Sequence, residues 1–119
     1  MAEVIDVRAK ARYIPISAQK VRLVINQIRG LPAIEAMDVL RFTPNNAARP
    51  VHKLLGSAIA NGEENFGMSR EDLYVYRIFA DEGPTRRWRR FGARGRFKPI
   101  LRRHSHITVV LREHESDED

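Results

Sequence analysis

The residues with the strongest chemical character lie between Arg86 and Lys98, where the sequence reads RRWRRFGARGRFK. This stretch holds seven cations, three aromatic residues and two glycines, and it has no acidic residue. Guanidinium groups form paired hydrogen bonds with phosphate oxygens, and aromatic rings stack on unpaired bases. Glycine allows a tight turn and a close backbone approach. The composition therefore predicts binding to a polyanion, and nucleic acid is the polyanion that it fits best.

The distribution of charge along the chain supports the same interpretation. The chain has 119 residues and a net charge of +6, and residues 86–103 carry nine cations with no acid. Residues 1–85 instead mix eleven cations with ten acids, as a solvated surface ordinarily does. A basic arm without a specific partner is the alternative. The aromatic residues of the stretch could also pack within a ribbon, and its glycines could serve turn geometry alone.

Several other chemistries lack the residues that they need. The chain has no cysteine, which excludes disulfides and thiolate metal sites. His104 and His106 could share a strand face, but a third metal ligand is missing. The stretch GARGR lacks the Gly-Lys-Ser/Thr of a phosphate-binding loop, and we find no nucleophile–base set. We therefore expect a protein that is not an enzyme and has no metal or cofactor.

The sequence also contains no segment suited to a membrane. No apolar run approaches the ~20 residues of a membrane span. The first ten residues have neither an apolar signal core nor a cleavage-like pattern. We expect a soluble intracellular protein with no membrane partner.

The elements that must position the basic stretch follow from hydrophobic periodicity. Residues 4–13 end in strict alternation, which predicts a half-buried strand with a basic outer face. Residues 73–80 and 106–112 are rich in β-branched and aromatic residues and predict two further strands. In the first strand, the expected inward residues are Val7, Ala9, Ala11 and Tyr13, and the expected outward residues are Arg8, Lys10 and Arg12.

Three helices are expected between the first and the second strand. Ser17 is placed as the N-cap of the first helix, and Gly30 as its end. Pro32 opens a short second helix, and Thr43-Pro44 opens the longest, in which Pro50 produces a kink or a restart. The expected buried residues are Val21, Val24, Ile25 and Ile28 in the first helix and Ile34, Met37 and Leu40 in the second. In the third they are Ala47, Val51, Leu54, Leu55, Ala58, Ile59, Gly62 and Phe66, with Gly67 as the end.

The predicted fold class is α+β, with a three-stranded antiparallel sheet packed with three helices and a long protruding β-hairpin. A single domain would span residues 1–112, with its body at 1–84 and 104–112 and its hairpin at about 84–103. A structureless loop of that length would be unusual, so we expect a two-stranded ribbon that turns near Gly92–Gly95. An isolated hairpin is marginal in water and its arginines repel, so we expect its partner to order it. We expect the acidic residues 113–119 to be disordered.

Five segments, in their order along the chain, resemble one family of ribosomal proteins. They are SAQKVRLVINQIRG (17–30), SAIANGEENF (57–66), DEGPTRRWRR (81–90), ARGR (93–96) and RRHSHITVVL (102–111). Together they make the sequence similar to the large-subunit ribosomal protein L twenty-two family, of bacterial type, from about residue 8 to residue 112.

The resemblance implies a structural constituent of the large subunit of the cytoplasmic ribosome that binds rRNA during assembly. Its body would lie near the peptide exit tunnel, and its hairpin would line the tunnel wall. Its partners would be large-subunit rRNA, neighbouring ribosomal proteins and the nascent peptide at the hairpin tip. The implied tip residues are Gly92, Ala93, Arg94, Gly95 and Arg96. The residues expected to bind rRNA are Arg86, Arg87, Trp88, Arg89, Arg90, Arg102, Arg103 and His104 around the hairpin, and Arg8, Lys10, Arg12, Lys20 and Arg22 in the body.

Two other classes of function fit the sequence less well. A DNA-bending protein with a β-ribbon arm would need a self-complementary dimer face, and the sequence shows no spare apolar stripe for one. A nuclease would need a set of acids or histidines that cleaves RNA, and no such constellation is found.

Overall fold

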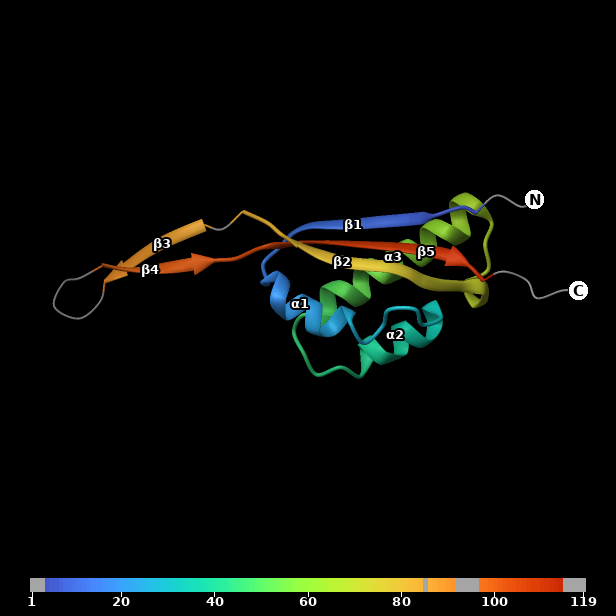
Figure 1. The fold of residues 1–119 in the computed structure, drawn as a ribbon, viewed down its shortest axis with the longest axis horizontal. Coiled ribbons are helices and arrows are strands. Elements are labelled where there is room, and N and C mark those ends of the chain that lie inside the picture. The colour runs from blue at the N-terminus through green and yellow to red at the C-terminus, as the bar shows by residue number, and fades with distance from the viewer. Residues whose placement is uncertain (1–3, 85, 92–96, 115–119) are drawn as a thin grey trace, which may run out of the picture.

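The described strands of this chain form two separate sheets, one in a folded body and one in a projecting hairpin (Figure 1). The structure is a computed structural model that describes residues 4–84, 86–91 and 97–114. It measures 74 × 26 × 20 Å, because the hairpin extends the long axis of the body. The α+β class and the protruding hairpin are therefore as predicted.

The sheet of the body has three antiparallel strands in the order β1-β5-β2. They are β1 (Val7–Ile14), β2 (Leu73–Glu82) and β5 (Ser105–Glu113), the last of which ends one residue beyond the predicted strand. The central strand β5 places Ile107, Val109 and Leu111 on the buried face, and all three are inaccessible to solvent. The chain thus brings the two arms of the hairpin out of neighbouring strands, β2 and β5.

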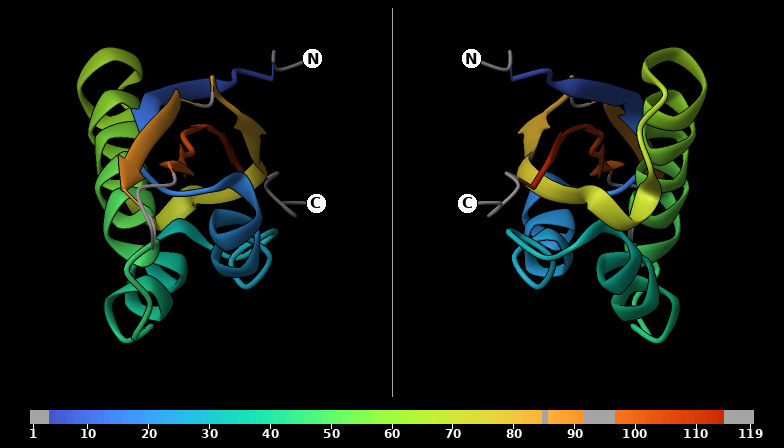
Figure 2. Two further views of the ribbon diagram at one scale, coloured as in Figure 1. Left: turned by 90° about the vertical axis from the view of Figure 1, so that its left-hand side faces the viewer. Right: turned by 90° about the vertical axis from the view of Figure 1, so that its right-hand side faces the viewer.

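The helices gather on one face of this sheet. They are α1 (Ala18–Ile25), α2 (Ala33–Arg41) and α3 (Ala48–Phe66), and a short 3-10 turn, η1, follows at Arg70–Asp72. Figure 2 shows α3 along the side of β1, and α1 and α2 next to β2. In the part of the chain that the structure describes, no helix lies over the opposite face.

The core lies between α3 and the sheet. Val51, Leu55 and Ala58 of α3 are fully buried. Gly62 continues this stripe where α3 comes closest to the strands, since a Cβ there would lie 3.2 Å from Leu73 Cδ1. Burial of each large aliphatic side chain contributes about 1.5–3 kcal/mol. The body therefore has the apolar contacts that a stable fold requires.

The predicted buried stripes of the first and third helices are confirmed except at Phe66, and in the second helix Leu40 is buried as predicted. The first helix ends at Ile25 and not at Gly30 as predicted, because residues 26–30 form turns. Ser17 Oγ accepts a hydrogen bond from the Lys20 N–H, and Gly67 ends α3 with a φ of +63°. Ile34 was predicted to be buried in α2 but is exposed, and Phe66 is also exposed. Ala33 and Ala36 occupy the buried face of α2 instead, because small side chains let this helix lie close to its neighbours.

The start of α3 was also predicted wrongly. The helix begins at Ala48 rather than at Thr43-Pro44. Asn45 forms the turn before it, with its carbonyl oxygen accepting from the Ala48 N–H and its side chain accepting from the Ala47 N–H. Pro50 therefore falls in the first turn, where no intrahelical N–H is needed, and does not kink the helix.

Two irregularities in the strands alter the faces of the sheet. The register of β1 shifts between Ala11 and Ile14, and Tyr13 there has a φ of +57° and is exposed, so its predicted inward orientation was wrong. A second shift between Val75 and Arg77 leaves Tyr76 and Arg77 both exposed. A bulge of this kind inserts one unpaired residue and so turns consecutive side chains outward.

The free edge of β2 is covered by the segment that follows α1. Gly30 N–H donates to the Val75 carbonyl, and Val75 N–H donates to Leu31. Arg29 and Arg22 each donate two side-chain N–H groups, to the carbonyl oxygens of Ile78 and Ala80. These contacts satisfy edge groups that would otherwise be open to another strand.

Among the described helices, none is both long enough and apolar enough to span a membrane.

Candidate nucleic-acid interface

The backbone of the basic stretch forms an antiparallel ladder. β3 (Arg86–Phe91) pairs with β4 (Phe97–Arg102) over six residues on each strand. The ladder is a sheet of its own and is not hydrogen-bonded into the sheet of the body. The predicted tip residues 92–96 lie outside the described residues. The predicted ribbon is therefore present on both sides of the tip.

The register of the ladder places like charges opposite each other. Arg86 pairs with Arg102, and Arg90 pairs with Lys98. Like charges directly opposite on an antiparallel pair destabilise it. Trp88 pairs with Ile100 between those two positions. The other stem arginines, Arg87 and Arg89, pair with Leu101 and Pro99.

The root of the hairpin joins the two ladders through a close backbone contact. Gly83 N–H donates to the His104 carbonyl oxygen at 2.8 Å, and His104 Nδ1 lies 3.3 Å from the Pro84 carbonyl oxygen. A Cβ at Gly83 would lie 3.3 Å from the backbone of His104, which explains a glycine here. Three residues separate Glu82 from Arg86 on one arm, whereas two separate Arg102 from Ser105 on the other. One arm therefore carries an extra residue at the root.

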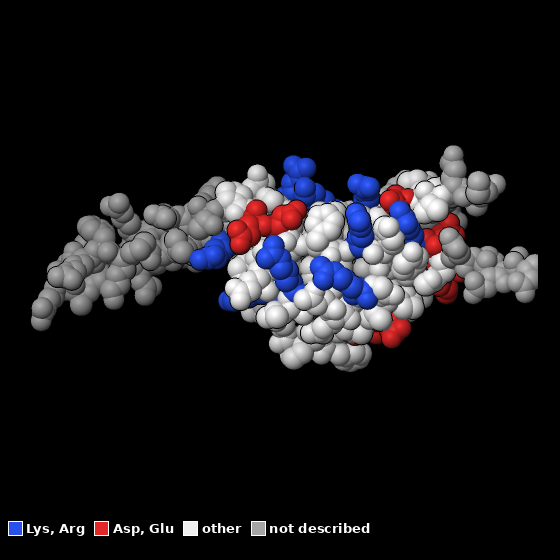
Figure 3. Space-filling view, viewed as in Figure 1, with Lys and Arg blue, Asp and Glu red and all other residues white. Residues whose placement is uncertain are grey.

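The face of the sheet opposite the helices is basic, as the alternation in the first strand predicted. Arg8, Lys10 and Arg12 are all exposed on β1. Arg8 lies opposite Val110 of β5, which in turn lies opposite Arg77 of β2. Lys and Arg side chains are spread over the front of the body in Figure 3, with acidic side chains near the hairpin root and at the far end. The open face of the body is thus basic along β1, with acidic side chains near the hairpin root.

At the end of this face that lies away from the hairpin, Arg112 contacts other side chains of the body. Arg112 Cζ lies 3.5 Å from the centroid of the Tyr76 ring, and Arg112 Nε donates to Asp6 Oδ1 at 2.5 Å. The hydrogen bond from Arg112 lowers the pKa of the Asp6 carboxyl below its ordinary value. His114 stacks on Tyr74 with a centroid distance of 4.5 Å. Arg112 is thus already partnered within the body, and Arg8 of β1 also lies 3.8 Å from Asp6 Oδ2.

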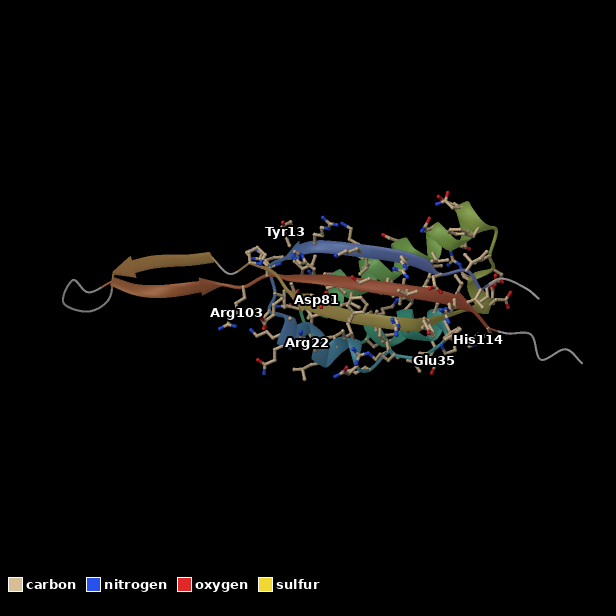
Figure 4. All side chains as sticks on the ribbon, turned by 45° about the horizontal axis from the view of Figure 1, so that its top comes forward. Tyr13, Arg22, Glu35, Asp81, Arg103 and His114 are labelled. Atoms are coloured by element: carbon tan, nitrogen blue, oxygen red, sulfur yellow. The ribbon has the colours of Figure 1, made fainter. Side chains whose placement is uncertain are left out.

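The two predicted contact residues of α1 differ in their surroundings. Lys20 is exposed in the first turn of the helix and lies at the hairpin root. The Arg22 guanidinium instead donates to Ala80 on the edge of β2, with its Nη2 atom 2.8 Å from the carbonyl oxygen. Figure 4 shows Arg22 and Arg103 below Tyr13 in this view, with Asp81 above Arg22. Arg103 is exposed, and His104 is half-buried.

Sequence reasoning missed two parts of this surface. Arg77 and Phe79 of β2 belong to the open face, but the bulge at Tyr76 breaks the alternation that would have revealed them. The loop at Asn45-Asn46 lies beside the hairpin root, and no local pattern indicates this. Within the described residues, no group of three His, Cys, Asp or Glu residues is placed to hold a metal ion.

The fold and this surface define a class of protein, namely a small basic α+β protein with a cationic two-stranded extension. The sequence matches the protein family described as ribosomal protein L22p/L17e over residues 9–112. The chain therefore belongs to this family of ribosomal proteins. The family consists of structural proteins of the large ribosomal subunit, which take part in translation, and is not an enzyme family. Membership implies a location in the cytoplasmic ribosome.

Proposed function

We propose that this chain binds rRNA during assembly of the large subunit, with its body near the peptide exit tunnel and its hairpin lining the tunnel wall. The observation that supports this most is the projecting ladder, whose segment 86–103 carries nine cations and no acid. A charge of that density is stable when phosphates surround it, because each contact releases condensed counterions.

The proposed contacts divide between the stem, the body and the tip. In the stem they are Arg86, Arg87, Trp88, Arg89, Arg90, Arg102, Arg103 and His104. In the body they are Arg8, Lys10, Arg12, Lys20 and Arg22. The tip, residues 92–96, meets the tunnel wall and the nascent peptide, and neighbouring large-subunit proteins complete the surroundings. Specificity comes from the shape of the RNA, because arginine–phosphate contacts do not read a sequence.

Matched charge reversals in the stem and the tip test this division. Arg89→Glu with Arg90→Glu should impair incorporation into large subunits, since both residues lie in the ladder. Arg94→Glu with Arg96→Glu should assemble and change the tunnel wall instead. Incorporation is measured by quantifying the chain in purified subunits, and the wall is examined in a map of each subunit. Normal incorporation of both variants at every salt concentration would contradict the proposal.

A further inference from the structure

A cleft opens at the root of the hairpin, where three distant parts of the sequence meet. Its volume is about 1030 Å³. One wall is the chain that enters α1, residues 15–20, and another is the loop before α3, residues 44–47. The third wall is the hairpin root itself, formed by Glu82-Gly83 on one arm and Arg103-His104 on the other. A molecule bound in this cleft would therefore contact the body and the hairpin at once.

The lining of the cleft favours an anion. Lys20 and Arg103 are exposed cations on different walls, and Glu82 is the one acid among the described residues that line the cleft. His104 adds an imidazole whose Nδ1 atom lies at the Pro84 carbonyl oxygen. Gln19 and Asn46 supply exposed amide groups, which can both donate and accept hydrogen bonds. The first turn of α1 contains no acidic residue that would offset these cations.

The third wall is held together by a close backbone contact between its two arms. The Gly83–His104 hydrogen bond and the short approach between these residues join the two arms where they leave the sheet. Arg103 projects from this root on the side where α1 lies (Figure 4). Its charge and that of Lys20 therefore face a shared space before any ligand is present.

We propose that this cleft binds a ribose–phosphate segment of a single RNA strand, which passes from the body onto the hairpin. The inference rests on the proposed rRNA-binding function and names a contact site within it. Arg103 is both a cleft residue and the last cation of the acid-free segment 86–103, so the cleft lies at the end of the basic segment of the sequence. The amides of Gln19 and Asn46 suit the ribose 2′-hydroxyl, which donates and accepts.

The test is an NMR titration of the full chain with a short single-stranded oligouridylate. Backbone amides of residues 17–20, 45–47, 83 and 104 should shift on addition. The variant Lys20→Ala with Arg103→Ala should lose these shifts and lower the salt slope of the affinity by about 1.4, at about 0.7 per phosphate contact. The control, Arg41→Ala with Lys53→Ala, removes the same charge from two exposed residues outside the cleft and should retain the shifts.

The outcomes separate this inference from the function on which it rests. Shifts of hairpin amides without shifts in the cleft would overturn the cleft site and leave rRNA binding intact. Equal effects of the cleft variant and the control would also overturn it. A polyglutamate peptide that produces the same cleft shifts as the oligouridylate would show a general carboxylate site instead. No response anywhere in the chain, together with no binding to rRNA, would overturn both.

Discussion

The body and the hairpin of this chain are stabilised by different means. The body packs α3 against a three-stranded sheet, and the side chains between them are buried aliphatic groups. The hairpin has two strands of six residues, and two of its six cross-strand pairs place cations opposite each other. A two-stranded ribbon is marginally stable at best in water. The body therefore contains its own stabilising contacts, whereas the hairpin carries a repulsion between its strands that a polyanion would offset.

The largest expected effect is that of salt concentration, which should weaken rRNA binding and leave the stability of the body nearly unchanged. If about 6–10 cations contact phosphates, raising salt from about 50 to 200 mM should weaken rRNA binding by about 10³–10⁵-fold. The unfolding midpoint of the free chain should move little, because its core is apolar. Fluorescence anisotropy with large-subunit rRNA and urea unfolding, measured over the same salt series, check both statements. An rRNA affinity that does not change across the salt series would contradict binding through cation–phosphate contacts.

A matched pair of isoleucines compares the two ladders directly. Ile107→Ala in β5 removes a fully buried side chain and should lower the free energy of unfolding by about 2–5 kcal/mol. Ile100→Ala in β4 should change it by less than about 0.5 kcal/mol, because the hairpin adds little to the fold of the free chain. Urea unfolding followed by circular dichroism measures both. A comparable loss for Ile100→Ala would mean that the hairpin unfolds together with the body.

The edge of β2 offers a smaller test within the body. Arg22→Met removes two hydrogen bonds to the Ala80 carbonyl oxygen and should lower the free energy of unfolding by about 1 kcal/mol. Hydrogen exchange of the β2 amides should also accelerate. Lys53→Met removes the same charge from an exposed position on α3 and is the control. An unfolding curve that Arg22→Met leaves unchanged would mean that these two hydrogen bonds do not stabilise the edge of β2.

The smallest expected effect is on the stability of the fold at acidic pH, to which Asp6 contributes. The hydrogen bond from Arg112 lowers the pKa of the Asp6 carboxyl from its ordinary value of 3.8. The ionised carboxyl therefore stabilises the fold above that pH, and this contribution is lost as the pH falls through the lowered pKa. In urea unfolding below about pH 4, Asp6→Asn should lose this part of the pH dependence. Asp38→Asn, an exposed carboxyl on α2, should retain it.

Local patterns in the sequence predicted the elements well where periodicity was regular. The stripe of α3 from Val51 to Gly62 repeats at helical spacing, and every one of its predicted members in that range is buried. Periodicity failed where small or irregular residues decide the packing. In α2, Ala36 rather than Ile34 faces the core of the body. In β1, the irregular pairing near Tyr13 places this side chain on the solvent side and not on the predicted inward side.

The candidate site also has one part that the sequence predicted and one part that it did not. The basic stretch could be recognised because its charge is continuous along the chain, and its hairpin because a loop of that length between two strands would be unusual. The cleft could not, because Lys20, Asn46 and Arg103 are far apart in sequence and meet only through the packing of α1, α3 and the hairpin root. Arg22 shows the converse, since a cation in a basic motif turns out to satisfy a carbonyl oxygen of the sheet.

The extra residue at the hairpin root separates the pairing of the two ladders. A slip of one residue in an antiparallel ladder moves every side chain of a strand to the other face. Because the surplus residue interrupts the pairing between Glu82 and Arg86, a change of pairing in β3 and β4 is not forced upon β2 and β5. Paired residues could be added to or removed from the hairpin without turning Ile78 or Leu111 out of the core. The length of the hairpin can therefore change while the fold of the body stays the same.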